Sequence, residues 1–368
     1  MDSYMINELN ATLQQALGLN KATSACLAQI IIAVIMQRTV NLKKLAVGMR
    51  GKAKIDSQYR RLQRFFAKVS FPQHKLATLL VNLFFPVDAR LYLALDRTNW
   101  KWGACNLNFL VLSACYQGAA IPLYWIALDK KGASCTSERL LMMAKFIVGL
   151  GAERIAGLLA DREFEGTDWF SYLVSENIAF DIRLKKSCMT TNARGARVQV
   201  STLFRHLKVG ECEVLTQPRK IMGQSVFLSA LRLSDGELLI VATQRDPECS
   251  ISRYGWRWEI ETLFACLKGR GFNFEETRLT DLVRIETMFG VLALAFAWAH
   301  KVGDWRHENQ MPIAIKNHGR KAMSFFRYGL DWIAQALFNL EHRLEQLYEC
   351  IRLFKIYSND VNSTKVLC

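Results

Sequence analysis

Apolar residues recur every three or four positions through the first 87 residues, a spacing that predicts helices with one buried face. Prolines at 72 and 86 interrupt this pattern and are expected to end or begin elements. Five helices are predicted, over residues 7–17, 24–38, 42–49, 57–69 and 73–84. Residues 1–87 are therefore predicted to form an all-helical domain.

Beyond residue 87 the pattern changes to short apolar runs, which are typical of strands. Three strands, a helix and a fourth strand are predicted in turn, over residues 91–95, 107–115, 119–128, 137–150 and 155–160. The first strand leads into Asp96 and the fourth into Asp161. A single later helix is expected over residues 252–268, stopped by Gly269. This order, with acidic residues at the first strand, the fourth strand and a late helix, is the layout of a ribonuclease-H-like fold.

Residues 184–236 alternate between polar and apolar side chains, which indicates a largely β subdomain inserted into that fold. The ribonuclease-H-like core is therefore predicted in two parts, 88–183 and 237–303, with a returning strand at 238–242. The segment 304–368 is predicted to begin with a polar connector, 304–312. A long helical stretch over 320–354 and a loose tail from 358 follow. The apolar stripe of that stretch fits either packing against the chain's own core or a contact between protomers.

Charge is the next informative feature, because the chain carries a net charge of +15 and suggests a polyanionic partner. Residues 41–68 contain nine basic residues and a single acid, Asp56, while 184–236 contain nine basic and three acidic residues. The helices 42–49 and 57–69 resemble a helix-turn-helix, so the second could contact DNA or could be a basic helix that reads no sequence. The candidate DNA-binding residues are Lys52, Lys54, Arg60, Arg61 and Arg64.

The late helix carries Tyr254, Arg257, Glu261 and Lys268 within an arc of roughly 60° around its axis. One carboxylate, two cations and a phenol would make a poor core face. The competing carboxylate Glu259 is expected to point about 160° away from Glu261. This stripe is therefore the candidate partner of the two strand-ending aspartates.

Asp96, Asp161 and Glu261 would repel one another if brought together, so they stay ionised side by side only with cations between them. Two Mg²⁺ ions, for which Mn²⁺ can substitute, would organise an attacking and a leaving oxygen across a phosphodiester. Arg257 and Lys268 would then hold flanking phosphates. The alternative is structural, because an aspartate that ends a strand is commonly a turn former or helix cap, and charge on a helix usually marks a solvated face.

The spacing Tyr254-x2-Arg257-x3-Glu261-x6-Lys268 resembles the Tyr-Arg-Glu-Lys signature of the bacterial insertion-sequence-4 family of DDE transposases. Asp96 with Thr98 is similar to the first acidic motif of that family, and Asp161-Arg-Glu-Phe to its second. The resemblance covers residues 88–303 and implies Asp96, Asp161 and Glu261 as catalytic metal ligands. It also implies that Tyr254, Arg257 and Lys268 position the DNA.

Relatives that cut through a hairpin intermediate use a tryptophan of the β insertion to stack a flipped base. This chain has no tryptophan between Trp169 and Trp256, and the aromatic residues of the insertion are Phe204 and Phe227. There are two possibilities: one of these phenylalanines stacks on the base less well than a tryptophan would, or cleavage proceeds without a hairpin. We predict cleavage without a hairpin.

The remaining composition narrows the class of protein. Ten cysteines show no metal-ligand spacing, and no secretory leader is recognisable, which predicts reduced and mostly buried thiols in a cytoplasmic protein. The family resemblance implies a bacterial protein that is associated with the nucleoid when it is bound to DNA. The longest apolar runs, 25–36 and 288–300, are interpreted as buried helices too short to cross a membrane.

The sequence therefore predicts a transposase that binds the terminal inverted repeats of an insertion sequence as double-stranded DNA. It would cut those ends and join the 3′ hydroxyls to target DNA, working as a homodimer on paired ends. Two alternatives stay open: a catalytically silent DNA-binding relative that acts as a repressor, and a site-specific nuclease without strand transfer.

Overall fold

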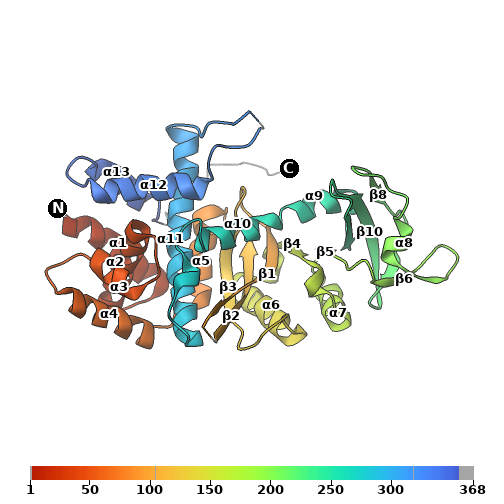
Figure 1. Cartoon of the computed structure of the whole chain (residues 1–368), viewed down its shortest axis with the longest axis horizontal. Helices are drawn as coiled ribbons and strands as arrows, with labels where there is room; N and C mark the ends of the chain where they lie inside the picture. The colour runs from red at the N-terminus through yellow and green to blue at the C-terminus, as the bar shows by residue number, and fades with distance from the viewer. Residues whose placement is uncertain (1, 104, 318, 356–368) are drawn as a thin grey trace.

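The computed structural model describes residues 2–103, 105–317 and 319–355 of the chain. Helices gather at one end, a sheet lies in the middle, and small strands form the other end of an elongated molecule (Figure 1). The fold is mixed α/β around a central mixed sheet. This arrangement is consistent with a ribonuclease-H-like core.

The five predicted N-terminal helices are present, with ends that differ by a few residues. They are α1 (Asp2–Leu17), α2 (Lys21–Gln37), α3 (Leu42–Gly48), α4 (Ile55–Lys68) and α5 (Gln73–Phe84). α2 is apolar on nearly all sides and is buried among its neighbours, as expected of a helix inside a cluster. On α4, Leu62 and Phe66 are buried, whereas Arg60 and Arg64 are exposed.

The central sheet joins strands in the order β3-β2-β1-β4-β5-β11-β10-β8, with β9 paired to β10. The strands of its second half are β8 (Cys212–Val214), β9 (Arg219–Ile221), β10 (Gln224–Arg232) and β11 (Leu238–Thr243). Its first half consists of β1 (Leu91–Trp102), β2 (Cys105–Ala114), β3 (Ile121–Ala127), β4 (Ile155–Ala160) and β5 (Phe180–Arg183), with α6 (Thr136–Leu150) and α7 (Thr167–Ser175) between strands. β1 is parallel to β4, and Leu95 pairs with Ala160. Asp96 and Asp161 are the next residues on these neighbouring strands, so they lie side by side.

The prediction that Asp96 ends its strand is wrong. β1 continues for six residues beyond it, and Asp96 pairs with Val111 of β2. The residues that follow Asp96 alternate between buried and exposed positions, and their backbone completes an antiparallel ladder with β2. Asp96 therefore lies in the middle of a strand, whereas Asp161 directly follows β4 as predicted.

Three of the five strands in the interval 184–236 extend the central sheet, and the other two form a small sheet of their own. β10 pairs with β11, which pairs with β5, and β8 and β9 pair with β10. The two-stranded sheet of β6 (Met189–Thr191) and β7 (Arg197–Gln199), followed by α8 (Val200–Leu203), is separate. The expected β content is therefore present.

Helix α11 (Leu282–Asn309) runs through the junction between the N-terminal helices and the sheet (Figure 1). The predicted polar connector is wrong at its start, because residues 304–309 continue this helix and buried Asp304 accepts a hydrogen bond from Tyr116. At 28 residues α11 is long and apolar enough to cross a membrane, but 78% of its apolar window is buried inside the fold. The bent pair α1–α2 passes the same test only if it is counted as one span.

The predicted helix over 320–354 is broken into α12 (Phe325–Phe338) and α13 (Leu344–Arg352). Its apolar stripe, including Leu330, Ile333 and Ile351, is buried within the chain. Packing against the chain's own fold therefore accounts for the stripe. The predicted tail lies outside the described residues.

The nine described cysteines are all free thiols. Three of them are buried, two are partly buried and four are exposed, so the prediction of mostly buried thiols is wrong.

Candidate active site

The helix predicted over 252–268 is two helices, α9 (Ser250–Gly255) and α10 (Trp258–Leu267), joined at Trp256 and Arg257. Across the junction the amides of Trp256, Arg257, Glu259 and Ile260 bond the carbonyls three residues earlier, which is the tighter 3₁₀ pattern. The break does not separate the predicted stripe. Tyr254 at the end of α9 and Glu261 in α10 both reach Arg257 at the junction.

Arg257 is the centre of the cluster, with a side chain that is only 4% exposed. Its Nη1 donates to Asp96 Oδ2 at 2.8 Å and its Nη2 donates to Glu261 Oε1 at 2.7 Å. Its Nε donates to the Tyr254 hydroxyl at 3.1 Å, and that hydroxyl donates to Asp161 Oδ1 at 3.1 Å. One guanidinium thus links all three predicted carboxylates, two directly and the third through Tyr254.

The carboxyl group of Asp96 has a strongly raised pKa. Burial raises its pKa from 3.8 to about 7, although the nearby Arg257 charge and the backbone N–H of Arg97 act in the opposite direction. Glu163 and Asp161 add repulsion that raises the pKa further. Burial also raises the pKa of Tyr254 to about 12, so its hydroxyl is a hydrogen-bond donor at neutral pH.

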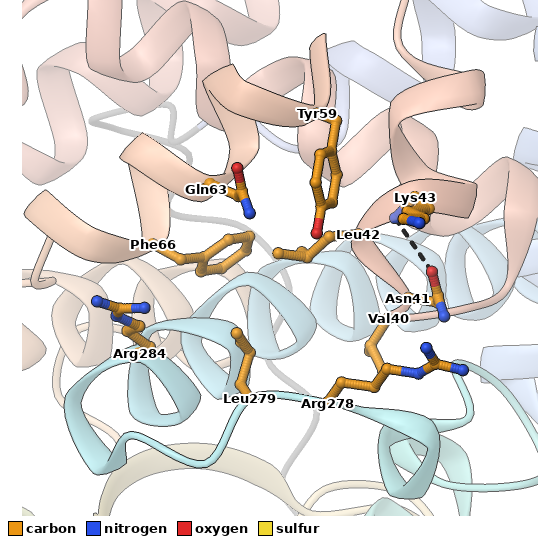
Figure 2. A pocket seen from close by; sticks show the side chains of 10 residues that line it. All are labelled: Val40, Asn41, Leu42, Lys43, Tyr59, Gln63, Phe66, Arg278, Leu279 and Arg284. Atoms are coloured by element: carbon orange, nitrogen blue, oxygen red, sulfur yellow. Dashed lines mark hydrogen bonds between the residues drawn. The ribbon is translucent and has the colours of Figure 1, made fainter. Parts of the chain in front are cut away.

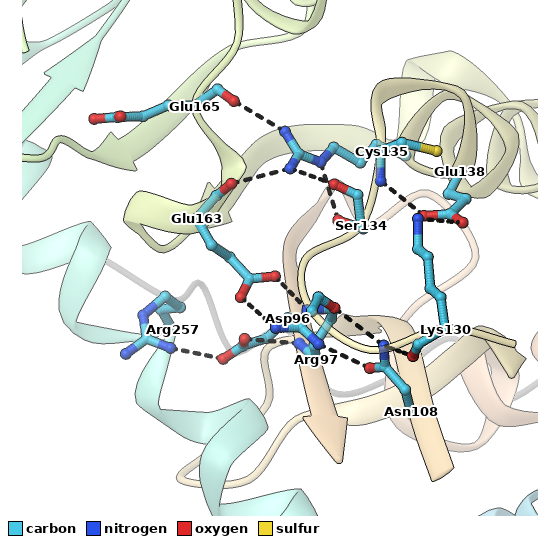
Figure 3. Close-up of polar contacts among 12 residues, drawn as sticks. Asp96, Arg97, Asn108, Lys130, Ser134, Cys135, Glu138, Glu163, Glu165 and Arg257 are labelled. Carbon is cyan, nitrogen blue, oxygen red and sulfur yellow. Dashed lines mark hydrogen bonds and ion pairs between the residues drawn. The ribbon is translucent and has the colours of Figure 1, made fainter. Parts of the chain in front are cut away.

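An ion-pair network next to Asp96 was not predicted from the sequence (Figure 3). Arg97 Nε and Nη2 donate to the two carboxylate oxygens of Glu163 at 2.7 and 2.9 Å, and its Nη1 donates to Asn108 Oδ1 at 2.8 Å. Arg139 donates to the Glu163 carbonyl at 2.9 Å. Since Arg97 follows Asp96 and Glu163 follows Asp161 by two, this network ties together the two backbone segments that carry the aspartates. The adjacency of Arg97 and Glu163 to the two aspartates was the available sequence signal.

Lys268 and Glu259, at the end and the start of α10, lie outside the carboxylate cluster. Lys268 pairs with Glu275 at 3.0 Å and lies over the Trp100 ring, and the structure shows no contact between it and the three carboxylates. Glu259 accepts hydrogen bonds from the backbone N–H groups of Tyr116 and Gly118. It therefore fixes the β2–β3 turn to α10 and faces away from the cluster, as predicted.

The donor set of the cluster suits a hard divalent cation, because Asp96, Asp161 and Glu261 all offer carboxylate oxygens. Within the described part of the chain, however, no three acidic, His or Cys side chains lie close enough together to hold a metal ion. The guanidinium of Arg257 stands between Asp96 and Glu261. The residue types fit Mg²⁺, but Asp96 and Glu261 could share a Mg²⁺ ion only if Arg257 moved away from them.

A second feature is a basic groove between α4 and the start of α11. One cavity of about 650 Å³ is lined by Arg60, Arg64 and Arg284, together with Ser57, Gln63 and Ala67. A neighbouring cavity of about 260 Å³ includes Lys43, Arg278 and Tyr59 (Figure 2). Throughout residues 2–103, 105–317 and 319–355, no carboxylate lies within ion-pair distance of Arg60, Arg64, Arg278 or Arg284.

The predicted DNA-binding cations are not equivalent in this groove. Arg60 and Arg64 line it, and Lys52 and Lys54 are exposed in the segment before α4. Arg61 is partly buried and donates to Gln29 Oε1 at 3.1 Å, which makes it a contact between α4 and α2. Arg278 and Arg284 were missed, because they lie more than 200 residues from α4 in sequence and only the fold brings them across from it.

The aromatic residues considered for base stacking differ in exposure. Phe204 is fully buried, so it cannot stack on a base without unfolding its surroundings, whereas Phe227 is partly buried. Trp258 is 60% exposed and its ring centroid lies 5.5 Å from the Arg257 guanidinium carbon. An exposed indole beside Arg257 is therefore present on α10.

Part of the sequence is similar to a known family of transposases. A family model described as a transposase DDE domain matches residues 123–298, which include Asp161, Tyr254, Arg257, Glu261 and Lys268 but not Asp96. The match supports a DDE-type transposase. Among solved structures, a piggyBac transposase synaptic complex with hairpin DNA, determined by cryo-electron microscopy, aligns with 98% of this chain and 84% of its own at 10% identity and a TM-score of 0.44. No curated protein sequence matches the chain.

Proposed function

We propose that the chain is a transposase of the bacterial insertion-sequence-4 type, which cuts the ends of its element and joins the 3′ hydroxyls to target DNA. The observation that supports this most is the convergence of Asp96, Asp161 and Glu261, from β1, the end of β4 and α10, around one arginine. The catalytic core would comprise residues 88–183 and 237–303. Residues 1–87 would bind DNA, 184–236 would form the basic insertion, and 304–368 would complete the helical end.

Asp96, Asp161 and Glu261 would hold two Mg²⁺ ions, or Mn²⁺ in their place, in the proposed enzyme. These ions would lower the pKa of a water nucleophile and stabilise the leaving oxygen of a phosphodiester. The chain's own contribution is positional. β1 and β4 fix the two aspartates side by side, and the Arg97–Glu163 ion pair holds the segments that carry them.

Arg257 and Lys268 would contact phosphates beside the scissile bond, and Tyr254 would support the backbone there. A guanidinium pairs with a phosphate through two parallel hydrogen bonds, as it does with a carboxylate. Lys268 would reach a phosphate more distant from the cluster, since it lies at the end of α10 against Trp100. The three residues together would place a DNA strand along α10.

The basic groove would hold the DNA of the element's ends, with contributions from both sides. Arg60, Arg64, Lys52 and Lys54 would come from the helical domain and Arg284 from the start of α11. Arg61 would act indirectly by fixing α4 to α2. The measurable consequence is salt dependence, because each phosphate contact that is lost should reduce the slope of log affinity against log salt by about 0.9.

The proposed assembly is a homodimer on paired DNA ends, in the bacterial cytoplasm and on the nucleoid when DNA is bound. Coordinated cutting of two ends requires two active sites. The buried C-terminal stripe does not supply the dimer contact, because its apolar residues pack within the chain.

The test is a cleavage assay on DNA that carries the sequences flanking the gene. Nicks at two fixed positions are expected in Mg²⁺ or Mn²⁺ and none in EDTA, and joined products should follow on target DNA. Asp96→Asn, Asp161→Asn and Glu261→Gln should each lose cleavage while retaining DNA binding, because each removes a ligand charge but keeps the shape. Exposed Glu248→Gln is the matched control and should cut normally.

The outcomes separate the alternatives. A wild-type protein that binds the flanks but cuts nowhere is a repressor-like relative, and cutting without joined products indicates a nuclease. An amide variant that cuts at the wild-type rate would show that its carboxylate is wrongly assigned.

A further inference from the structure

Arg257 occupies carboxylate oxygens that a metal ion at this site would also need. Its guanidinium bonds Asp96 and Glu261 on one side and Tyr254 on another, and Tyr254 in turn bonds Asp161. A divalent cation shared by Asp96 and Glu261 would need the oxygen atoms that Arg257 now engages. Two cations at this buried place would repel each other strongly. Arginine and metal ion are therefore alternative partners of the same carboxylates.

The structure also provides a route by which Arg257 can leave. It lies in the junction between α9 and α10, where i to i+3 bonds replace the regular helical ladder. The neighbouring residues Trp256 and Trp258 are 41% and 60% exposed, and the Trp258 ring is 5.5 Å from the guanidinium carbon. A change of side-chain rotamer toward Trp258 would carry the charge to the surface, over an aromatic face that stabilises a cation.

A DNA phosphate is the ligand that could draw Arg257 out, because its two non-bridging oxygens offer the same paired geometry as a carboxylate, and the DNA backbone carries a row of such charges. Resting on the proposed function, we propose that Arg257 is an internal counter-ion that closes the carboxylate cluster to divalent cations until a DNA phosphate takes its guanidinium. DNA and metal ion then bind cooperatively. By linkage, DNA raises the affinity for the metal by the same factor as the metal raises the affinity for DNA.

This arrangement has a functional consequence for a cutting enzyme. Without DNA, Arg257 bonds Asp96 and Glu261 and Tyr254 bonds Asp161, so the cluster would hold no metal-activated water. The site becomes competent only when a phosphate backbone lies along α10. A protein that carries such an arginine would avoid cutting DNA that is not fully seated.

The test measures Mn²⁺ binding directly, by the electron paramagnetic resonance signal of the free ion, in metal-stripped protein with and without duplex DNA of the gene's flanks. In wild type, DNA should raise the Mn²⁺ affinity by roughly tenfold or more. Arg257→Gln keeps a polar side chain but removes the charge. Without DNA, this variant should bind Mn²⁺ roughly tenfold more tightly than wild type does without DNA, and adding DNA should raise its Mn²⁺ affinity little further. Asp161→Asn in the Arg257→Gln background should abolish this gain, which locates the ion.

Arg257→Lys is the second variant, because it keeps the charge and should retain weak Mn²⁺ binding without DNA. If Arg257→Gln does not fold, the wild-type comparison with and without DNA decides, and equal affinities overturn the proposal. Arg257→Gln that folds and binds Mn²⁺ no better than wild type also overturns it. Failure of the proposed function would look different: the DNA flanks would be neither bound nor cut, while Arg257→Gln could still gain Mn²⁺ affinity.

Discussion

Asp96 should make the stability of the protein depend on pH in a way that Asp96→Asn removes. The pKa of Asp96 is raised by burial from 3.8 to about 7 in the folded chain, while the unfolded chain retains the ordinary value. A carboxyl whose folded pKa is raised favours folding when protonated. Its contribution is therefore fully present below about pH 4 and is lost as the pH rises through about 7.

The size of this effect follows from the pKa shift and from the burial of the side chain, which is 15% exposed. Each pKa unit corresponds to about 1.4 kcal/mol, so the whole shift amounts to about 4 kcal/mol, spread over the range from below pH 4 to above pH 7. Between pH 5 and 8 the loss should be about 3 kcal/mol. The amide introduced by Asp96→Asn does not titrate, so this variant should gain stability relative to wild type by that amount over the same interval.

The measurement is urea denaturation followed by tryptophan fluorescence, at several pH values between 5 and 8 and in EDTA. EDTA removes divalent cations, which would otherwise stabilise the ionised carboxylate and hide the effect. Asp129→Asn, at an exposed position, is the matched control and should follow the wild-type pH dependence. Wild type and Asp96→Asn that change in parallel across this range would refute the raised pKa of Asp96.

Three further predictions concern contacts around the site and the core. Arg97→Ala and Glu163→Ala should show a coupling free energy of about 1–3 kcal/mol in a double-mutant cycle of unfolding, and additivity would show that the ion pair contributes nothing. Glu259→Gln should lower the free energy of unfolding by about 2 kcal/mol, because an amide cannot accept both backbone N–H groups equally; an unchanged urea midpoint would contradict this. Gly303→Ala should cost about 3 kcal/mol, because its Cβ would lie 1.8 Å from the Phe325 carbonyl oxygen, and an unchanged melting temperature would exclude that close helix contact.

Elements set by local pattern were predictable from the sequence. The five N-terminal helices follow from apolar spacing and prolines, and β4 with Asp161 behind it follows from a short apolar run. The stripe of Tyr254, Arg257 and Glu261 was also predictable, since a spacing of three or four residues places side chains on one face of a helix. These features depend on neighbours in the sequence.

Features that depend on distant partners were not predictable in the same way. β1 continues past Asp96 because β2 supplies hydrogen bonds to polar residues that do not read as a strand alone. Helix α11 continues through polar residues 304–309, where Tyr116 from the β2–β3 turn satisfies Asp304. The groove between α4 and α11 likewise unites Arg60 with Arg284. In each case the deciding contact comes from another part of the chain.

The position of Arg257 on the helix was predictable from residue type and spacing, but its partners were not. The sequence places a cation beside a carboxylate on one helix face, and both a phosphate ligand and a carboxylate partner satisfy that pattern. The choice depends on Asp96, which comes from a strand 161 residues earlier and meets Arg257 at 2.8 Å. The Arg257 side chain is only 4% exposed, and its guanidinium already bonds two carboxylates. A phosphate must therefore compete with these carboxylates for the guanidinium. Recognition of DNA and release of the acidic cluster would therefore be one event, and the residue that contacts the substrate would also govern the site that cuts it.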